Sequence, residues 1–391
     1  RAEDIREETA IKLYGDEMRA SVSRFQSYFS CHFQHFSNYG MKLNVRQNYT
    51  VRPLEIGNLY HNALEQITKR LDMTLKHDDE VIKKAVVNSV DNVLRTISYG
   101  IFERSEYFLS LKEKAISAIT TTLMFMKDLE YLGDYQISLI EATFGKKSDD
   151  LGELVLESEN GKKIYLRGKI DRVDTYNNAS NVYVNIIDYK SSDRKLKKED
   201  VLNGVELQII TYMYVLMNRA KTKLGGDIVP NAMMFYHVNE PKVRVDDEEE
   251  ALKLKQNKLR PDGLFVIDGN DLSSNTGMDH MIEEEKLSEY LPLKLKKDGS
   301  LDKNSAKRTM SSEMFAHYSN FVMEQFKTAT DEIYSGRTLA NPLEHNNRLP
   351  CAFCDFKAAC HIDKLINEHD YRKNKITDED IEAFESEVNN G

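Results

Sequence analysis

The segment "NVYVNIIDYKSS", residues 181–192, combines a β-strand pattern with charged groups near its end. β-branched residues are frequent in it, and successive side chains of a strand point to opposite faces of the sheet. One face therefore carries three apolar residues followed by a carboxylate and an ammonium group: Val182, Val184, Ile186, Asp188 and Lys190. A carboxylate there can bind a hard divalent cation, and the lysine can stabilise charge on a phosphate. We therefore expect Asp188 and Lys190 to belong to a functional site.

A second carboxylate belongs to the preceding predicted strand, which contains "GKIDRVD", residues 168–174. The two strands are separated by the length of a hairpin connection, so Asp171 and Asp188 are expected to meet. An aspartate at the end of a strand is usually a cap or a turn former, and D-x-K alone is a weak pattern. The pair gains meaning only from the motifs around it.

Two predicted helices add polar residues to this constellation. His61 and Glu65 lie one turn apart in "GNLYHNALEQITKRL", residues 57–71, and Gln208 and Tyr212 share one face of the helix after the sheet. A lone histidine on an amphipathic helix is more often structural than a ligand. The order carries the prediction: histidine on a helix, aspartate on a strand, D-x-K on the next strand and Q-x-x-x-Y on the next helix.

The sequence of predicted elements indicates a mixed α/β core flanked by helices. The first third of the chain has helical periodicity, and strand patterns then follow at 135–145, 153–174 and 181–190. A helix that stops at Gly225 separates these from a last strand at 231–238. The charged runs after Pro241 are expected to be mostly solvated loops.

Four segments follow from this pattern. They are an N-terminal helical segment at 1–130, a core at 131–240, a charged insertion with one helix at 241–340, and a C-terminal cysteine-bearing segment at 341–391.

Composition narrows the class of protein. The chain has 391 residues, of which 40% are hydrophobic and 30% charged, as in soluble multidomain proteins. No apolar run approaches ~18 residues, so no membrane span is expected. The chain lacks an initial Met and a signal-peptide pattern, so we expect a piece of a longer protein in the reducing environment of the cytoplasm.

The charge distribution bears on nucleic-acid binding. A net charge of −10 argues against indiscriminate binding of nucleic acid, but it leaves room for a local basic groove. "KSSDRKLKK", residues 190–198, concentrates basic residues directly after the D-x-K strand. This segment predicts a basic lip that tracks phosphates, with a solvated loop as the alternative.

The cysteines form a second pattern. The chain contains four: Cys31 stands alone near one end, and Cys351, Cys354 and Cys360 follow the spacing C-x2-C-x5-C near the other. Four thiolates can bind zinc or an iron–sulfur cluster. From spacing alone zinc is the commoner outcome, although zinc sites often pair two short C-x2-C knuckles.

The segments "GNLYH", "GKIDRVD", "DYKSS" and "ELQIITY", in this order, resemble the RecB-like branch of the PD-(D/E)xK nucleases. Within that branch, the residues around Cys31 and the C-terminal "CAFCDFKAAC" are similar to the nuclease region of the AddB (RexB) family of helicase–nuclease subunits. The resemblance implies a restriction-endonuclease-like mixed sheet flanked by helices. It also implies a [4Fe–4S] cluster on the four cysteines that joins the two ends of the chain.

The resemblance also implies roles for individual residues. His61, Asp171 and Asp188 would ligate Mg2+ or Mn2+, Lys190 would be the catalytic lysine, and Gln208 and Tyr212 would lie near the DNA. Glu141 would have a supporting role. His32 stands where relatives often have proline, which should alter the local turn rather than the ligation by Cys31.

The function implied is metal-dependent hydrolysis of single-stranded DNA in double-strand break repair. The enzyme would act on the 5′-terminated strand, beside an AddA-like helicase–nuclease partner. Two alternatives remain open: a free-standing RecB-like exonuclease, and a catalytically idle DNA-binding domain held together by zinc.

Overall fold

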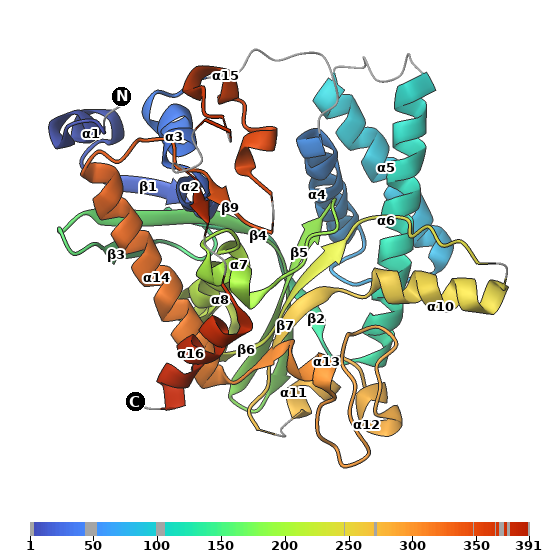
Figure 1. The fold of residues 1–391 in the computed structure, drawn as a ribbon. Helices are drawn as coiled ribbons and strands as arrows, with labels where there is room; N and C mark the ends of the chain where they lie inside the picture. Colours follow the sequence, from blue (N-terminus) through green and yellow to red (C-terminus); the bar gives the residue numbers. More distant parts are fainter. Residues whose placement is uncertain are drawn as a thin grey trace.

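The computed structural model describes residues 4–43, 53–98, 106–245, 247–269, 272–346, 348–363, 365–366, 371–373 and 376–389. A mixed sheet lies at the centre, with helices on both faces (Figure 1). The mixed α/β core expected from the sequence is confirmed. Among the helices of the described ranges, none is both long and apolar enough to cross a membrane.

The sheet is organised around the long strand β4 (Lys163–Asn178). The strand order is β1-β4-β5-β6-β7-β8, and β2 and β3 also pair with β4. β4 runs antiparallel to β2, β3 and β5 and parallel to β1. The remaining strands are β1 (Met18–Ser21), β2 (Gln136–Phe144), β3 (Leu154–Glu157), β5 (Asn181–Lys190), β6 (Asp227–His237), β7 (Asp262–Val266) and β8 (Thr309–Met310).

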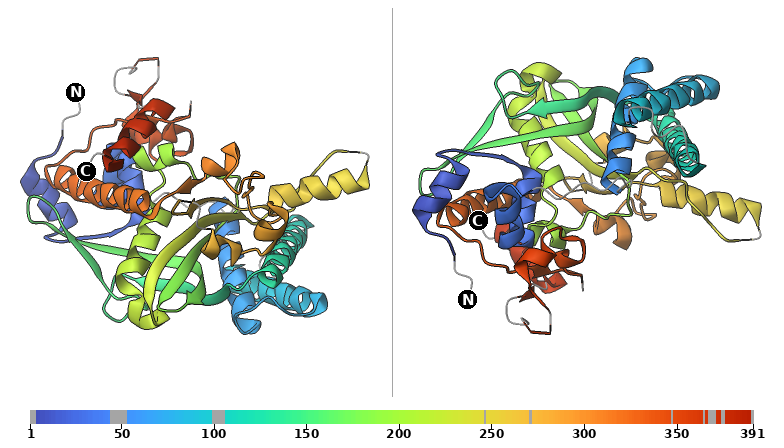
Figure 2. Two further views of the ribbon diagram at one scale, coloured as in Figure 1. Left: turned by 90° about the horizontal axis from the view of Figure 1, so that it is seen from below. Right: turned by 90° about the horizontal axis from the view of Figure 1, so that it is seen from above.

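The expectation of solvated loops after Pro241 was wrong for part of that region. β7 is buried along its whole length and pairs antiparallel with β6, and β8 pairs with β7. α10 (Glu248–Leu259) is helical and extends away from the body of the molecule in all views (Figures 1 and 2). The strand was missed because "DGLFV" is a short apolar run between long charged segments, and its burial depends on the neighbouring strand.

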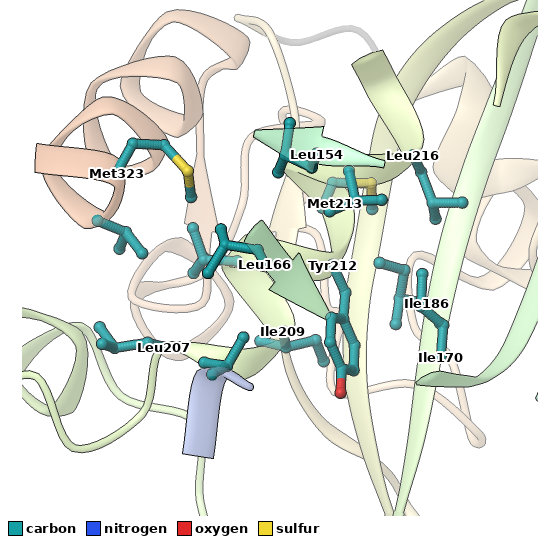
Figure 3. Close-up of a cluster of buried hydrophobic side chains, with 14 of the residues drawn as sticks. Leu154, Leu166, Ile170, Ile186, Leu207, Ile209, Tyr212, Met213, Leu216 and Met323 are labelled. Atoms are coloured by element: carbon teal, nitrogen blue, oxygen red, sulfur yellow. The ribbon is translucent and has the colours of Figure 1, made fainter. Parts of the chain in front are cut away.

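One face of the sheet packs against α8 (Gln208–Arg219), α14 (Ser312–Tyr334) and α2 (Val22–Ser30). Figure 3 shows the buried side chains from this layer, including Ile186 of β5 and Leu216 of α8. α8 is shorter than expected because the helix breaks at Ala220 and resumes as α9 (Lys221–Leu224), which ends at Gly225.

The other face of the sheet packs against α4 (Pro53–Arg70), α5 (Asp79–Ser98) and α6 (Glu106–Leu132). Ile187 and Tyr189 of β5 join the core on this side. The alternation expected for 181–190 therefore divides its side chains between two helical layers. The strand is buried on both faces, and its end lies between α4 and α8.

α3 (His32–His35), near the start of the chain, lies beside α15 (Lys357–Cys360), near its end (Figure 1). The backbone N–H of His32 donates to Asn341 Oδ1 at 2.9 Å, and Ile5 N–H donates to the Gly336 carbonyl at 3.0 Å. Near this junction lie α1 (Glu7–Tyr14), α3 (His32–His35), the π-helix η1 (Phe36–Gly40), the 3-10 helix η3 (Pro350–Phe353) and α15 (Lys357–Cys360).

The remaining short elements lie in the C-terminal half of the chain. They are α7 (Lys198–Leu202), α11 (Ser273–Thr276), α12 (Met281–Glu285), α13 (Lys303–Ala306), α16 (Asp378–Asn389), and the pair β9 (Leu343–Glu344) and β10 (Arg372–Lys373).

A substitution in α4 tests how this layer holds the site. Leu64, which lies in the same helix as His61, is 1% exposed, whereas Leu252 in α10 is 67% exposed. Leu64→Ala should lower the free energy of unfolding by about 2–5 kcal/mol, because it leaves a cavity. Leu252→Ala is the matched control and should change it by no more than about 0.5 kcal/mol. Urea denaturation measures both, and equal losses would contradict the packing described here.

Candidate functional site

The ends of β4 and β5 bring two carboxylates together. The β4–β5 ladder reaches the pair Arg172–Ile187, and Asp171 and Asp188 occupy the next position on each strand. Asp171 Oδ2 accepts a hydrogen bond from the Tyr189 backbone N–H at 2.9 Å. Asp171 is 9% exposed and Asp188 is 3% exposed, so two acidic groups share a site with little water.

Lys190 neutralises part of this charge. Its ammonium group forms an ion pair with Asp188 and lies 4.7 Å from the centroid of the Phe235 ring. Burial and the neighbouring charge of Asp171 raise the pKa of Asp188 to about 7, against the opposing effect of Lys190. A carboxyl group with such a pKa loses its proton easily to a bound cation, because the cation replaces the proton as the neutralising charge.

His61 reaches the site from α4. Its Nδ1 lies 3.1 Å from Asp171 Oδ2. Burial lowers the pKa of His61, but the hydrogen bond to Asp171 and the charges of Asp171, Asp188 and Glu141 outweigh it, and the pKa is raised overall. One ligand atom each from His61, Glu141 and Asp171 lie within 4.8 Å of one another. An imidazole and two carboxylates at this spacing suit a divalent cation.

Glu141 is more central than the sequence suggested. It lies opposite Asp171 in the β2–β4 pair, between Ile140 and Ala142, and its φ of 53° is left-handed. Such a conformation is costly for a residue with a side chain inside a strand, and it is found where a side chain must be redirected. Burial raises the pKa of Glu141, although Lys169 forms an ion pair with it. The resemblance implied only a supporting role for Glu141, and the structure adds its position beside His61 and Asp171.

Gln208 and Tyr212 connect α8 to the strand that carries Asp171. Gln208 Nε2 donates to Tyr212 Oη at 2.9 Å, and the backbone of Lys169 also hydrogen-bonds this hydroxyl. Tyr212 is 5% exposed and lies among core side chains with its hydroxyl at one end of the cluster (Figure 3). Burial raises the pKa of Tyr212 further above its ordinary value, so the hydroxyl stays neutral. This position suits a residue that holds the strand in place.

Glu206 is a buried charge that the sequence analysis did not single out. It is 1% exposed, and its Oε2 lies 2.9 Å from Arg194 Nε. Burial raises the pKa of Glu206, and the positive charges of Arg194 and Lys190 oppose this. The carboxylate therefore joins the charge network behind the D-x-K strand. Its place two positions before Gln208 in "ELQ" was the only sequence signal.

The four cysteines share one pocket, which Phe33 and Ile362 also line. Burial raises the pKa of the Cys351 thiol, and the charges of Cys31, Cys354 and Cys360 raise it further. Within the described ranges, no three of the sulfur atoms lie within 4.8 Å of one another. Sulfur ligands of a tetrahedral zinc ion at ~2.3 Å from the metal would be about 3.8 Å apart. The sulfur atoms of the described cysteines are therefore farther apart than the ligands of a bound zinc ion.

His32 helps to fix the position of Cys31. Its ring stacks on Tyr28 with centroids 4.2 Å apart, and its Nδ1 lies 3.0 Å from the Asn341 side-chain amide. Burial lowers the pKa of His32 to about 4, so the ring is neutral. The residue expected only to alter a turn thus ties the first cysteine to the C-terminal segment.

Comparison with known proteins agrees with this geometry. Residues 19–361 match the model of the PD-(D/E)XK nuclease superfamily. The chain belongs to the PD-(D/E)XK nuclease superfamily. The family expected from the order of the motifs is therefore confirmed, and the paired carboxylates and lysine of β4 and β5 lie inside the matched region of this PD-(D/E)XK chain.

Two relatives of this PD-(D/E)XK chain are each named as the B subunit of an ATP-dependent helicase/deoxyribonuclease. The protein from Staphylococcus haemolyticus (strain JCSC1435) is 32% identical over 397 residues, covering 97% of this chain and 34% of the relative. The protein from Staphylococcus aureus (strain MRSA252) is 31% identical over 388 residues, covering 96% and 33%. The chain thus spans about a third of the length of the curated relatives that it matches.

A glycine beside the site provides a test of its packing. A Cβ at Gly168 would lie 2.6 Å from two Phe144 ring carbons and 3.0 Å from a Tyr212 ring carbon. Gly168→Ala should therefore push both rings and lower the free energy of unfolding by about 1–3 kcal/mol. At Gly57 in α4 the nearest atom, Ser191 Oγ, is 3.6 Å away, so Gly57→Ala should be neutral or stabilise by up to about 1 kcal/mol. Calorimetry distinguishes them, and a neutral Gly168→Ala would contradict the close approach.

Proposed function

We propose that this chain is a metal-dependent deoxyribonuclease domain that hydrolyses phosphodiester bonds in single-stranded DNA. Membership of the nuclease superfamily supports the reaction class. The observation that carries the proposal is the adjacency of Asp171 and Asp188, with Lys190 paired to one and His61 to the other. An idle domain has no need to bury these charges together, because each one costs free energy away from water.

Mg2+ or Mn2+ fits the donors of this site. We assign His61, Asp171 and Asp188 as ligands and add Glu141, because His61, Glu141 and Asp171 already lie within 4.8 Å of one another. Oxygen and imidazole donors match such cations, and the raised pKa of Asp188 reflects charge that a cation would balance. When bound, the cation would acidify an attacking water and neutralise charge on the phosphate.

The remaining groups have supporting roles in the proposed reaction. Lys190 holds a positive charge at the end of β5, where it can donate a hydrogen bond to a phosphate oxygen. The carboxylate of Asp171 orients the His61 ring through their 3.1 Å contact. Gln208 and Tyr212 hold β4 in place against α8. The Tyr212 hydroxyl hydrogen-bonds Gln208 of α8 and the backbone of Lys169 in β4.

We further propose that the domain works within a longer helicase–nuclease polypeptide, beside an AddA-like partner. The relatives' name, which includes both helicase and deoxyribonuclease, supports this assignment, and so does their threefold greater length. The same comparison disfavours a free-standing exonuclease. Exonucleolytic action on the 5′-terminated strand in double-strand break repair belongs to the same proposal, and it rests on resemblance to the AddB family.

The cysteine pocket is proposed to hold a [4Fe–4S] cluster. Four thiols from both ends of the chain line one pocket, and their spacing is wider than zinc requires. Iron–sulfur clusters take four cysteine thiolates and tolerate ligands that are distant in sequence. The cluster would staple the segment before α4 to the C-terminal segment, and its binding would contribute to folding.

Substitution of the D-x-K strand tests the catalytic assignment. Asp188→Asn and Lys190→Met should each lower the rate of Mg2+-dependent cleavage of single-stranded DNA by at least about 100-fold, because each removes charge from the reacting centre. Melting temperature and DNA binding in EDTA should change little. Lys253→Met removes a lysine from the exposed surface of α10 and serves as the control, with unchanged activity expected. Cleavage at the normal rate by either site variant would refute the assignment.

Loss of a cysteine tests the staple. Cys31→Ser and Cys354→Ser should behave alike, because either change removes a ligand of one shared cluster. Each variant, purified without oxygen, should lose the brown absorbance and its iron and sulfide. Each should also unfold more easily, by less than the roughly 10 kcal/mol that zinc contributes in small domains. Full metal content and stability in Cys31→Ser alone would favour a local zinc site with His361 as the fourth ligand.

A further inference from the structure

A charged groove begins where the catalytic strand ends. Its volume is about 670 Å³, and it runs between α7, the β7–β8 side of the sheet and α16. Lys195, five positions after Lys190 in the chain, lines its beginning. The segment between them is fixed in place, because the Arg194 carbonyl lies 2.7 Å from His237 Nε2 and Arg194 pairs with Glu206. The groove therefore has a fixed position relative to the site.

The basic lip expected from the sequence is largely neutralised within the protein. Lys197 pairs with Glu199 at 2.9 Å, and Lys198 pairs with Glu385 of α16 at 2.7 Å. Lys190 and Arg194 also have acidic partners. Of the five basic residues in 190–198, Lys195 alone has no carboxylate within 4 Å in the described part of the chain. A strand of DNA would have to compete with these carboxylates.

The opposite wall of the groove is acidic. α16 contributes the exposed Asp378 and Glu382 together with the half-buried Glu385. Lys307, which is exposed at the far side of the groove, adds another positive charge without a carboxylate within 4 Å among the described residues. Carboxylates and lysines thus line the same groove.

α16 is held in place by few side chains. Phe384 packs against His317, Tyr318 and Phe321 with ring centroids 4.2, 5.0 and 5.2 Å apart. Glu385 accepts a hydrogen bond from Tyr318 Oη at 3.1 Å and pairs with Lys198. The helix is therefore anchored at its middle, and its acidic first turn rests on no buried side chain of its own.

We propose that this groove binds the phosphodiester backbone of a single DNA strand beside the catalytic site, and that the carboxylates of α16 compete with the phosphates for its lysines. This inference rests on the proposed nuclease function. Charges of opposite sign within a Debye length of ~10 Å attract, so α16 lowers the affinity of the groove for a polyanion. Weak binding by the free groove restricts cleavage to strands that are delivered to it.

The test measures binding of a fluorescent single-stranded oligonucleotide by anisotropy in EDTA at low salt. The variant Asp378→Asn/Glu382→Gln/Glu385→Gln removes three charges from α16. It should bind at least about threefold more tightly, because three negative charges that oppose the phosphates are removed. The matched control, Glu283→Gln/Glu284→Gln/Glu285→Gln, removes three exposed charges from α12, whose Ile282 packs on the other face of the sheet. It should change the affinity by much less.

A second pair of measurements tests the lysines. Lys195→Ala/Lys307→Ala should weaken binding and reduce the slope of log K against log salt by about 1.4, at ~0.7 per lost phosphate contact. Should the triple α16 variant melt early, Asp378→Asn/Glu382→Gln keeps the Lys198–Glu385 pair and should still bind more tightly.

The outcomes separate this inference from the nuclease proposal. Equal gains in the α16 and α12 variants would show an effect of net charge alone, and unchanged affinity in the α16 variants would show no competition. Either result would contradict the proposed competition in the groove, whereas metal-dependent cleavage by the unaltered chain would still support the nuclease proposal. If the unaltered chain neither binds nor cleaves single-stranded DNA, both proposals fail.

Discussion

The burial of two adjacent carboxylates is the constraint on which the rest of the structure depends. Asp171 and Asp188 lie on neighbouring strands with less than a tenth of their surface exposed. Like charges in so dry a site repel each other, and neither is well solvated. Lys190 forms an ion pair with Asp188, and the His61 ring contacts Asp171. The remaining repulsion and the burial raise the pKa of Asp188 to about 7. A divalent cation is the natural completion of such a site, because it supplies the positive charge that these groups still lack.

The layers around the sheet fix this arrangement from both sides. α4 brings His61 to one face of β5, and α8 brings Tyr212 to the other. α4 also follows Cys31 in the chain, and Cys31 meets the C-terminal cysteines in one pocket. A cluster there would hold the N-terminal segment against the C-terminal segment, and the chain between them contains the whole sheet. The cysteine pocket and the paired carboxylates are thus two fixed points of one framework.

Much of this framework could be predicted from the sequence, because its signals are local. The alternation in 181–190 and the spacing of Gln208 and Tyr212 are properties of short segments, and the structure places these residues together around the ends of β4 and β5. The parts that failed depend on distant neighbours. β7 becomes a strand because β6 offers it an edge. For Glu141 the resemblance implied a supporting role, but no periodicity reveals the left-handed φ found at this residue beside His61 and Asp171. Likewise, a run of lysines shows positive charge but not the partners, such as Glu385, that neutralise it.

The pairing of these lysines bears on how a chain with a net charge of −10 could carry out the proposed cleavage of DNA. Affinity for a polyanion depends on the local field, and a lysine paired to a carboxylate contributes little to it. When a phosphate replaces the carboxylate that pairs with a lysine, the lysine has one anionic partner before and after. The net free energy gained from binding is therefore small. A nuclease of the proposed kind would gain little from random encounters with nucleic acid and would depend on a high local concentration of its substrate. Attachment to a motor that feeds a strand into the groove would provide that concentration, since linked binding sites act at an effective concentration set by their geometry.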